Sequence, residues 1–277
     1  YINSSDSFTK FCTEQKKGGT RTRLYYKTLC EYKMLIPSLN EQHIIADYFD
    51  NLDHLITLHQ RKCDELKKVK KFMLQKMFPK KGEKNPEIRF DGFTNDWEQR
   101  KVGDYLTESR EIGNKGDVAR KMTVKLWGKG VYEKLEAGST NTQYFIRHAN
   151  QFIYSKLDFL NCAFGVVPEE LESLETTADV PAFDCVYMNP YFMFYRAIQP
   201  SFYIQNGIIA NGSRKAKRIH TDTFLEMPIS VPCLTEQNKI VGYFQSLDHL
   251  ITLHQRKCEE LKNVKKYMLQ NMFAKGE

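Results

Sequence analysis

A stretch of 38 residues occurs twice in this chain, and it limits the fold more than any other feature. The first copy is residues 41–78 and the second is residues 236–273, at a constant offset of 195 residues. Of the 38 aligned positions, 28 are identical, and the two copies agree without a break over residues 52–63 and 247–258. A repeat of this length indicates two structural units of the same kind.

Each copy has the pattern of a long helix. Apolar residues recur in steps of four and three, which is the heptad rule for a helix that packs along another helix. Residues 41–78 contain no Pro or Gly, and Asn40 and Thr235 precede the two copies as residues of the N-cap type. At a rise of about 1.5 Å per residue, such a helix reaches roughly 55 Å. A typical helix has only about 11–12 residues.

Two matching heptad helices in one chain can bury their apolar faces against each other. A whole domain lies between them, so the helices could pack either parallel or antiparallel. We expect antiparallel packing because it lets the chain close on itself. The alternative is a pair of ordinary core helices from a duplicated domain, which their length disfavours. The residues expected in the seam between the helices are Ile45, Phe49, Leu52, Ile56, His59, Cys63, Leu66, Met73, Ile240, Phe244, Leu247, Ile251, His254, Cys258, Leu261 and Met268.

The seam contains a histidine and a cysteine in each copy, four residues apart. His59 and Cys63 share one helix face, and His254 and Cys258 repeat them. Such residues could form a zinc site across the two helices. We favour polar or soft seam residues that fix the register of the pair, and we expect no metal and no cofactor.

Composition gives weaker limits. The net charge of +7 and the pI of about 8.9 point mildly to an anionic partner. The seven cysteines are scattered without CxxC spacing, which argues for reduced thiols in the cytoplasm. No apolar run approaches the roughly 18–20 residues of a membrane span, and no signal peptide is visible. We therefore expect a cytoplasmic protein without membrane contact.

The rest of the chain divides around the two predicted helices, residues 37–79 and 236–277. Residues 1–35 align at the same offset with residues 196–230, so we interpret residues 1–36 as the end of a first unit whose body is missing. The chain begins at Tyr1, which suggests a fragment or a truncated product. Residues 80–235 alternate short β-branched or aromatic runs with glycine turns, which predicts a mixed α/β domain.

Basic residues gather in the predicted turns of that domain. Loops of this kind suit contact with DNA phosphates and the reading of base edges. The densest run carries four charges in residues 214–218. For any single lysine, a solvated surface is the simpler interpretation. The residues predicted to bind DNA are Lys125, Trp127, Lys129, Arg147, Lys156, Arg214, Lys215, Lys217 and Arg218.

The chain lacks recognisable catalytic motifs. Asn189-Pro190-Tyr191-Phe192 is similar to the Asn-Pro-Pro-aromatic loop of adenine methyltransferases, but the second proline is absent. No glycine-rich loop follows a strand to hold S-adenosylmethionine, and there is no GxxxxGK[ST] phosphate loop. We therefore interpret residues 189–192 as a turn and expect no catalytic residues, while a methyltransferase built on Asn189 stays as the enzymatic alternative.

The chain resembles the specificity subunit of type I restriction–modification systems. The resemblance is carried by Pro-x-Leu-x-Glu-Gln at Pro37–Gln42 and Pro232–Gln237, each of which opens a long helix. The segment Pro86–Trp97, which opens the domain, adds to it, as do residues 152–157 and 163–168.

This resemblance implies a fold, a function and a set of partners. Residues 80–235 would be a complete target-recognition domain that reads one half of a split double-stranded DNA sequence. Residues 1–36 would be the C-terminal remnant of another such domain. The two antiparallel coiled-coil helices would dock two modification subunits, which methylate adenine, and a restriction subunit would join the full complex. The specificity subunit itself is not an enzyme. The alternative is a truncated interaction module or antirestriction decoy that sequesters modification subunits.

Overall fold

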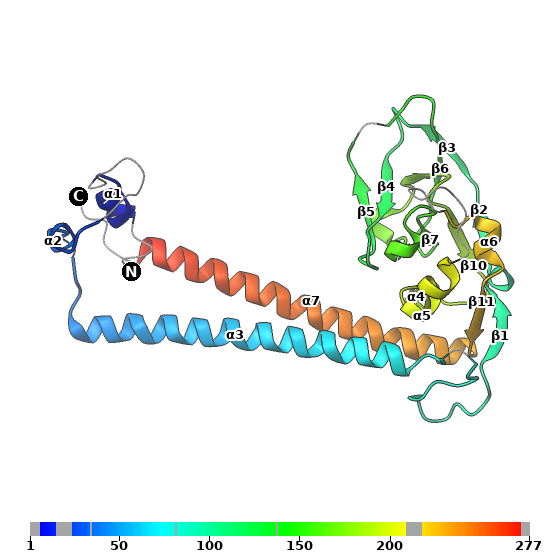
Figure 1. The fold of residues 1–277 in the computed structure, drawn as a ribbon, viewed down its shortest axis with the longest axis horizontal. Helices are drawn as coiled ribbons and strands as arrows, with labels where there is room; N and C mark the ends of the chain where they lie inside the picture. Colours follow the sequence, from blue (N-terminus) through cyan, green and yellow to red (C-terminus); the bar gives the residue numbers. More distant parts are fainter. Residues whose placement is uncertain are drawn as a thin grey trace. The chain divides into compact units, whose positions relative to one another are not determined.

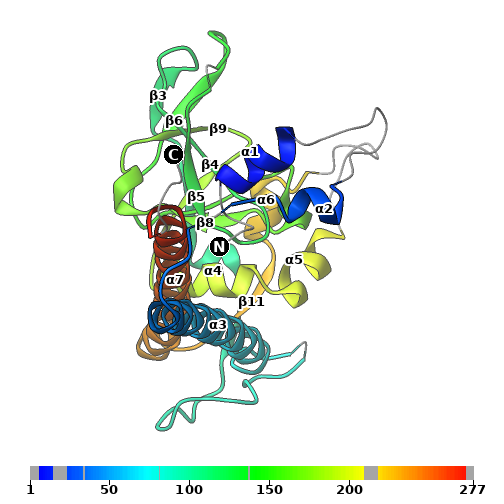
Figure 2. The same ribbon diagram turned by 90° about the vertical axis from the view of Figure 1, so that its left-hand side faces the viewer.

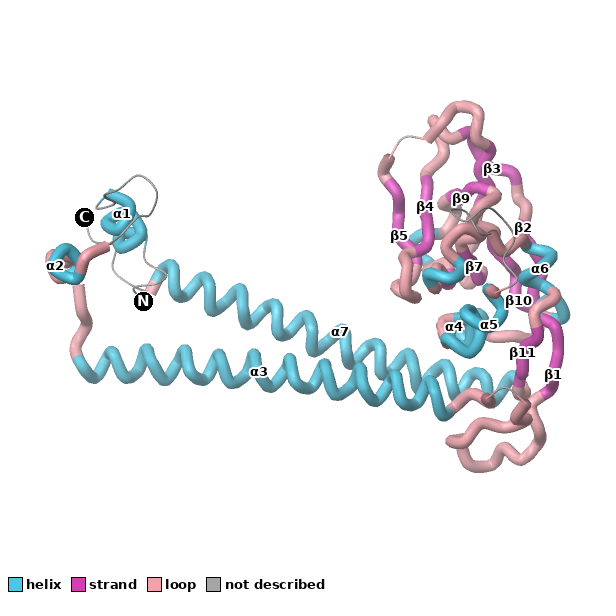
Figure 3. Tube along the Cα trace, in the orientation of Figure 1, coloured by secondary structure: helices cyan, strands magenta, loops and turns pink. Residues whose placement is uncertain are grey.

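The computed structural model describes residues 6–14, 24–33, 35–80, 82–136, 138–208 and 218–272. The chain divides into two compact units, one formed by residues 1–68 and 248–277 and the other by residues 69–247. Figure 3 shows that the described strands all belong to the second unit, whereas the described elements of the first are helices.

The long helices are α3 (Leu39–Lys76) and α7 (Leu234–Asn271), each of 38 residues. Within the first unit, their contacts run in opposite sequence order, because Lys265 of α7 pairs with Asp53 of α3 and His254 contacts His59. The predicted pair of long antiparallel helices is therefore confirmed (Figure 1). The same unit contains the short helices α1 (Asp6–Glu14) and α2 (Tyr26–Leu29).

The starts of the long helices differ from the sequence-based expectation. Asn40 and Thr235 lie inside the first turns rather than at the caps. Ser38 precedes α3, and its hydroxyl accepts the backbone N–H of Glu41 at 3.3 Å. A serine hydroxyl in this position satisfies one of the unpaired donors of the first turn.

The described strands of the second unit form three sheets. Two strands pair antiparallel beside the start of α7, namely β1 (Glu98–Lys101) and β11 (Pro228–Val231). The four-stranded sheet contains β2 (Leu106–Ser109), β10 (Ala182–Cys185), β7 (Phe152–Tyr154) and β8 (Phe164–Val166), in that order. The five-stranded sheet contains β3 (Ile112–Lys115), β6 (Gln143–Ile146), β9 (Glu175–Thr177), β4 (Lys121–Val124) and β5 (Val131–Lys134). Its β4–β9 pair is parallel, and its other neighbours are antiparallel.

The core of this unit lies on both faces of β7. Phe152 and Tyr154 point into an aromatic cluster that includes Phe224 of α6 (Thr221–Leu225), and the Tyr154 and Phe224 ring centroids are 4.5 Å apart. Ile153, which faces the other way, packs with Met122 and Val124 of the five-stranded sheet. Because side chains alternate along a strand, three consecutive apolar residues indicate a strand that is covered on both faces.

The aromatic run that follows Asn189 forms helix α4 (Pro190–Ala197). The Asn189 side chain accepts the backbone N–H of Tyr191 at 2.9 Å, and Pro190 occupies the first helical position. Asn189-Pro190 is therefore a helix start rather than a turn, since asparagine caps helices and proline suits their first position. Helix α5 (Pro200–Gly207) follows and lies beside α4 (Figures 1 and 2).

Candidate nucleic-acid interface

Three of the predicted DNA-binding residues lie on one hairpin loop. Strands β4 and β5 pair from Lys121↔Lys134 to Val124↔Val131, which leaves residues 125–130 as the connection. We call residues 125–130 the hairpin loop; it contains Lys125, Trp127 and Lys129. The Lys125 N–H donates to the Gly130 carbonyl at 2.8 Å and closes the loop.

The hairpin loop is fixed to the body of the domain through its backbone. The N–H of Trp127 donates to the carbonyl of Asn161 at 2.9 Å, and the N–H of Gly128 donates to the carbonyl of Cys162 at 2.8 Å. Trp127, with φ of 62°, has the left-handed conformation that bulky residues rarely adopt. A Cβ on Gly128 would lie 2.9 Å from the Ile198 side chain, so only glycine fits this close approach.

The outward face of the hairpin loop is aromatic and basic. The Trp127 side chain is 61% exposed, and Leu126 beside it is also exposed. Lys125 places its ammonium group 5.2 Å from the centroid of Tyr132, which is exposed on β5. Lys129 is exposed, and residues 125–130 contain no carboxylate. Sequence reasoning missed Tyr132, although its place next to Lys125 across the hairpin follows from antiparallel pairing.

A second basic region contains Lys156 and Arg218, which meet at Asp179. The backbone N–H of Lys156 donates to the Asp179 carbonyl at 2.9 Å, and the Lys156 carbonyl accepts the N–H of Ile219 at 3.0 Å. The Arg218 guanidinium lies 3.8 Å from the Asp179 carboxylate, and the two side chains are exposed. The remaining predicted residues of this basic run, Arg214, Lys215 and Lys217, lie outside the described residues.

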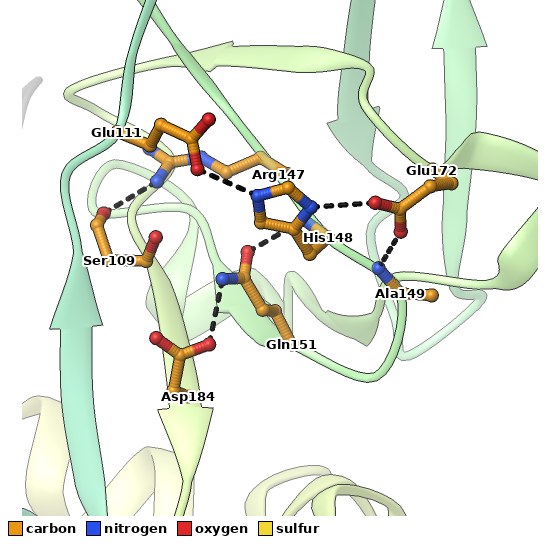
Figure 4. Close-up of polar contacts among 8 residues, drawn as sticks. All are labelled: Ser109, Glu111, Arg147, His148, Ala149, Gln151, Glu172 and Asp184. Carbon is orange, nitrogen blue, oxygen red and sulfur yellow. Dashed lines mark hydrogen bonds and ion pairs between the residues drawn. The ribbon is translucent and has the colours of Figure 1, made fainter.

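Arg147 does not fit a role in DNA contact, which corrects the expectation from sequence. Its side chain is only 2% exposed. Its Nε donates to the Thr176 hydroxyl at 2.7 Å. Its Nη1 donates to the Ser109 carbonyl at 2.7 Å, as Figure 4 shows. Burial lowers the pKa of Arg147 to about 10, which leaves it charged at neutral pH. Arg147 thus links β2 of one sheet to β9 of the other.

Next to Arg147, a histidine is held between two carboxylates, as Figure 4 shows. His148 Nε2 lies 2.8 Å from Glu111, and His148 Nδ1 lies 2.6 Å from Glu172. Hydrogen bonding to Glu111 and Glu172 raises the pKa of His148. The pKa of Glu172 is lowered, first by the backbone N–H of Ala149 and then by His148. Since both ring nitrogens face carboxylates, the arrangement favours the imidazolium form.

The Glu-Gln pair that opens the second long helix is a structural anchor. Glu236, which is almost fully buried, accepts two hydrogen bonds from the Arg89 guanidinium at 2.7 and 2.8 Å. Gln237 donates to the Pro232 carbonyl at 3.0 Å and accepts the backbone N–H of Asn189 at 2.9 Å. These contacts hold the opening segment of the domain and the start of α4 on α7.

The predicted seam residues occupy a range of environments. In the first unit, Leu52, Cys63, Ile251 and Cys258 are buried, while Ile45, Phe49, Ile56, His59, Leu66, His254, Leu261 and Met268 are half-buried. In the second unit, Ile240, Phe244 and Leu247 are buried and Met73 is half-buried. The His59 and His254 Nδ1 atoms are 2.9 Å apart, and Cys258 Sγ lies 3.9 Å from the Ile56 carbonyl.

The described residues contain no group of three or more His, Cys, Asp or Glu side chains arranged to hold a metal ion. The seven cysteines are free thiols. None of the helices within the described ranges combines the length and the apolar character needed to cross a bilayer.

Comparisons with known proteins agree on one family. The family described as the type I restriction modification DNA specificity domain matches residues 4–68 and 181–263. The chain is also similar to the specificity subunit of the type I restriction enzyme MjaVIII from Methanocaldococcus jannaschii. They share 24% identity over 292 aligned positions, which cover 96% of this chain and 67% of that protein.

Solved structures show the same fold. The HsdS subunit from Thermoanaerobacter tengcongensis matches 97% of this chain and 67% of its own, with a TM-score of 0.53 and 14% identity. The S subunit from M. genitalium matches 99% of this chain and 74% of its own, with a TM-score of 0.58 and 13% identity. At 13–14% identity, these two matches show a similar fold.

Proposed function

The chain belongs to the type I restriction–modification DNA specificity family, and from this premise we propose that residues 80–235 read one half of a split double-stranded DNA sequence. Members of this family recognise a DNA target and are not catalytic. The observation that carries the proposal is the family match, which covers more than half of the 277 residues.

Contact with DNA is supported by the two basic regions of the second unit. Lys125 and Lys129 flank the exposed Trp127 on a loop without carboxylates. Lysines in such a place suit phosphate contact, which positions a protein on the duplex, while aromatic and polar side chains contact base edges. Lys156 and Arg218 would extend the basic surface, and we include Arg214, Lys215 and Lys217 on their sequence alone. Arg147 is not part of the proposed surface.

Docking of modification subunits on the helix pair is supported by apolar residues that both copies of the repeat leave exposed. We call them the outer stripe; in each helix they form two pairs along one face. The members of a pair are three positions apart in the sequence, the two pairs are eleven positions apart, and Lys and Glu lie between the pairs. They occupy matching positions and are 40–63% exposed. They are Leu55, Leu58, Val69 and Phe72 of α3, and Leu250, Leu253, Val264 and Tyr267 of α7. Exposed apolar residues that gather along one face are typical of protein interfaces.

The repetition of the outer stripe favours two partners. Nearly identical surfaces on two helices, which differ in the stripe only by Phe72 and Tyr267, suit two copies of one partner, so we propose two modification subunits, one for each copy. The modification subunits would supply the adenine methylation, and a restriction subunit would join the full complex. Free cysteines, of which the chain has seven, suit the reducing cytoplasm, where we place the assembly.

Co-expression with a type I modification subunit tests the proposal. The purified complex should select particular duplexes from a library with randomised base pairs, and its affinity should fall as the salt concentration rises. A stable complex that binds DNA without selection would support an antirestriction decoy in place of a reader. Failure of the two proteins to associate would contradict the docking proposal.

A further inference from the structure

The hairpin loop has a property that phosphate contact does not require: it presents a large exposed ring from a backbone that is held in place. Trp127 is 61% exposed, yet its own N–H and that of Gly128 are bonded to Asn161 and Cys162. An exposed tryptophan on a mobile loop would lose conformational freedom on binding, whereas a loop held in place does not incur that cost. The backbone of Trp127 keeps an unfavourable left-handed conformation, and such conformations cluster at functional sites.

The surroundings of the ring indicate a nucleic-acid ligand. Lys125 and Lys129 lie two residues to either side of Trp127, and neither they nor the other loop residues bring a negative charge. Leu126, which precedes Trp127 in the loop, is also exposed. Two cations that flank an exposed aromatic ring match the alternation of phosphate and base along a strand.

We propose that Trp127 is a wedge that packs against the bases of the target, with Lys125 and Lys129 on the adjacent phosphates. This inference rests on the proposed function and adds a specificity-determining residue to it. Apolar side chains that enter a base step partly unstack it, and pyrimidine–purine steps such as TA and CA open most easily. The target half-site read by residues 80–235 therefore contains such a step under Trp127.

The chain offers variants that separate the ring from the fold. W127G removes the indole, and glycine accepts a φ of 62° without strain, so the loop keeps its conformation. W127F keeps an aromatic ring. L135A is the matched control, because Leu135 is a 90% exposed apolar side chain elsewhere in the same unit. Trp97 is buried and stays unchanged in all three variants.

The experiment uses the full chain with its modification subunits and a duplex selected by the wild-type complex. Affinity is measured by fluorescence anisotropy, and 2-aminopurine replaces each adenine of the duplex in turn to report unstacking. W127G should weaken binding about 5- to 150-fold, the range expected for loss of stacking on one base. W127F should recover most of the affinity, and L135A should bind like the wild type. The wild-type complex should raise the 2-aminopurine signal at one step, and saturating W127G should not.

The other outcomes overturn the inference in distinguishable ways. If W127G binds like the wild type with the same 2-aminopurine signal, Trp127 is not a wedge, although the proposed function stands. If W127G fails to retain the modification subunits, the loop is a protein contact. If the wild-type complex selects no duplex at all, the proposed function fails and the wedge fails with it.

Discussion

The imidazole rings of His59 and His254 face each other across the two long helices, with their Nδ1 atoms 2.9 Å apart. The two residues occupy the same position in the two copies of the repeat. A hydrogen bond between the rings requires one Nδ1 to carry a proton and the other to offer a lone pair. The two rings thus occupy the same position of the repeat, but one donates the hydrogen bond and the other accepts it.

This contact predicts that the two histidines are energetically coupled. H59L leaves the His254 ring without its hydrogen-bond partner, H254L does the same to His59, and H59L/H254L removes both rings. The loss of stability in the double variant should therefore be smaller than the sum of the two single losses. Urea unfolding of the three variants measures these losses, and strict additivity would show that the two rings do not interact.

The Arg89–Glu236 ion pair predicts that a Glu-to-Gln substitution destabilises the fold more at position 236 than at the matching position 41 of the first copy. E236Q removes the charge that pairs with Arg89 in a buried site, and breaking such a pair costs about 3–5 kcal/mol. E41Q changes the matching residue of the first copy, which is exposed, and should cost less than about 0.5 kcal/mol. Urea unfolding measures both values. Equal costs would mean that the ion pair does not anchor the domain.

The outer stripe predicts how many partners each variant binds. L253E places a carboxylate in the stripe of the second copy, and L58E does so in the first. Both side chains are exposed, so folding should change by less than about 0.5 kcal/mol. Each single variant should lose one modification subunit and the double variant should lose both, as measured by native mass spectrometry. T252E, at an exposed position outside the stripe, is the control. A double variant that still carries two partners would place the docking surface elsewhere.

His148 predicts a loss of stability at alkaline pH. Its pKa is raised above 6.5 by Glu111 and Glu172, so its contribution is complete below 6.5 and is lost as pH rises through the folded-state pKa. The lowered pKa of Glu172 acts in the opposite direction, and its contribution is lost as pH falls below 4.5. Because the three side chains are partly exposed, the effect of H148Q at pH 6 should be about 1 kcal/mol or less. Urea unfolding of the wild type and H148Q should show that their difference in unfolding free energy is smaller at pH 9 than at pH 6. A larger difference at pH 9 would contradict the claim that the protonated form of His148 is the stabilising one.

The long helices could be predicted from the sequence because their signal is local and repeated. The heptad steps indicate the helices, and the duplication indicates that they pack on each other. The register at His59 and His254 adds a detail that periodicity does not supply, because several offsets between two matching helices bury similar apolar faces.

The polar contacts of the domain could not be predicted in this way. Arg147 belongs to a basic series in sequence, and its burial depends on how β2 and β9 are brought together across the two sheets. Arg89 and Glu236 are 147 residues apart in the chain. The repeated Glu-Gln pair drew attention to Glu236, but nothing in the sequence indicated Arg89 as its partner. Asn189-Pro190 did carry a usable local signal, since a capping residue followed by proline is a common helix start.

The decisive measurement is the adenine methylome of a host that carries this chain with its modification subunit. Recognition by residues 80–235 predicts methylation at one sequence motif, part of which is lost or changed when this domain is exchanged for that of a relative while both long helices are kept. Formation of a stable complex with methylation that has no sequence preference, or with a motif that the exchange leaves unchanged, would contradict it.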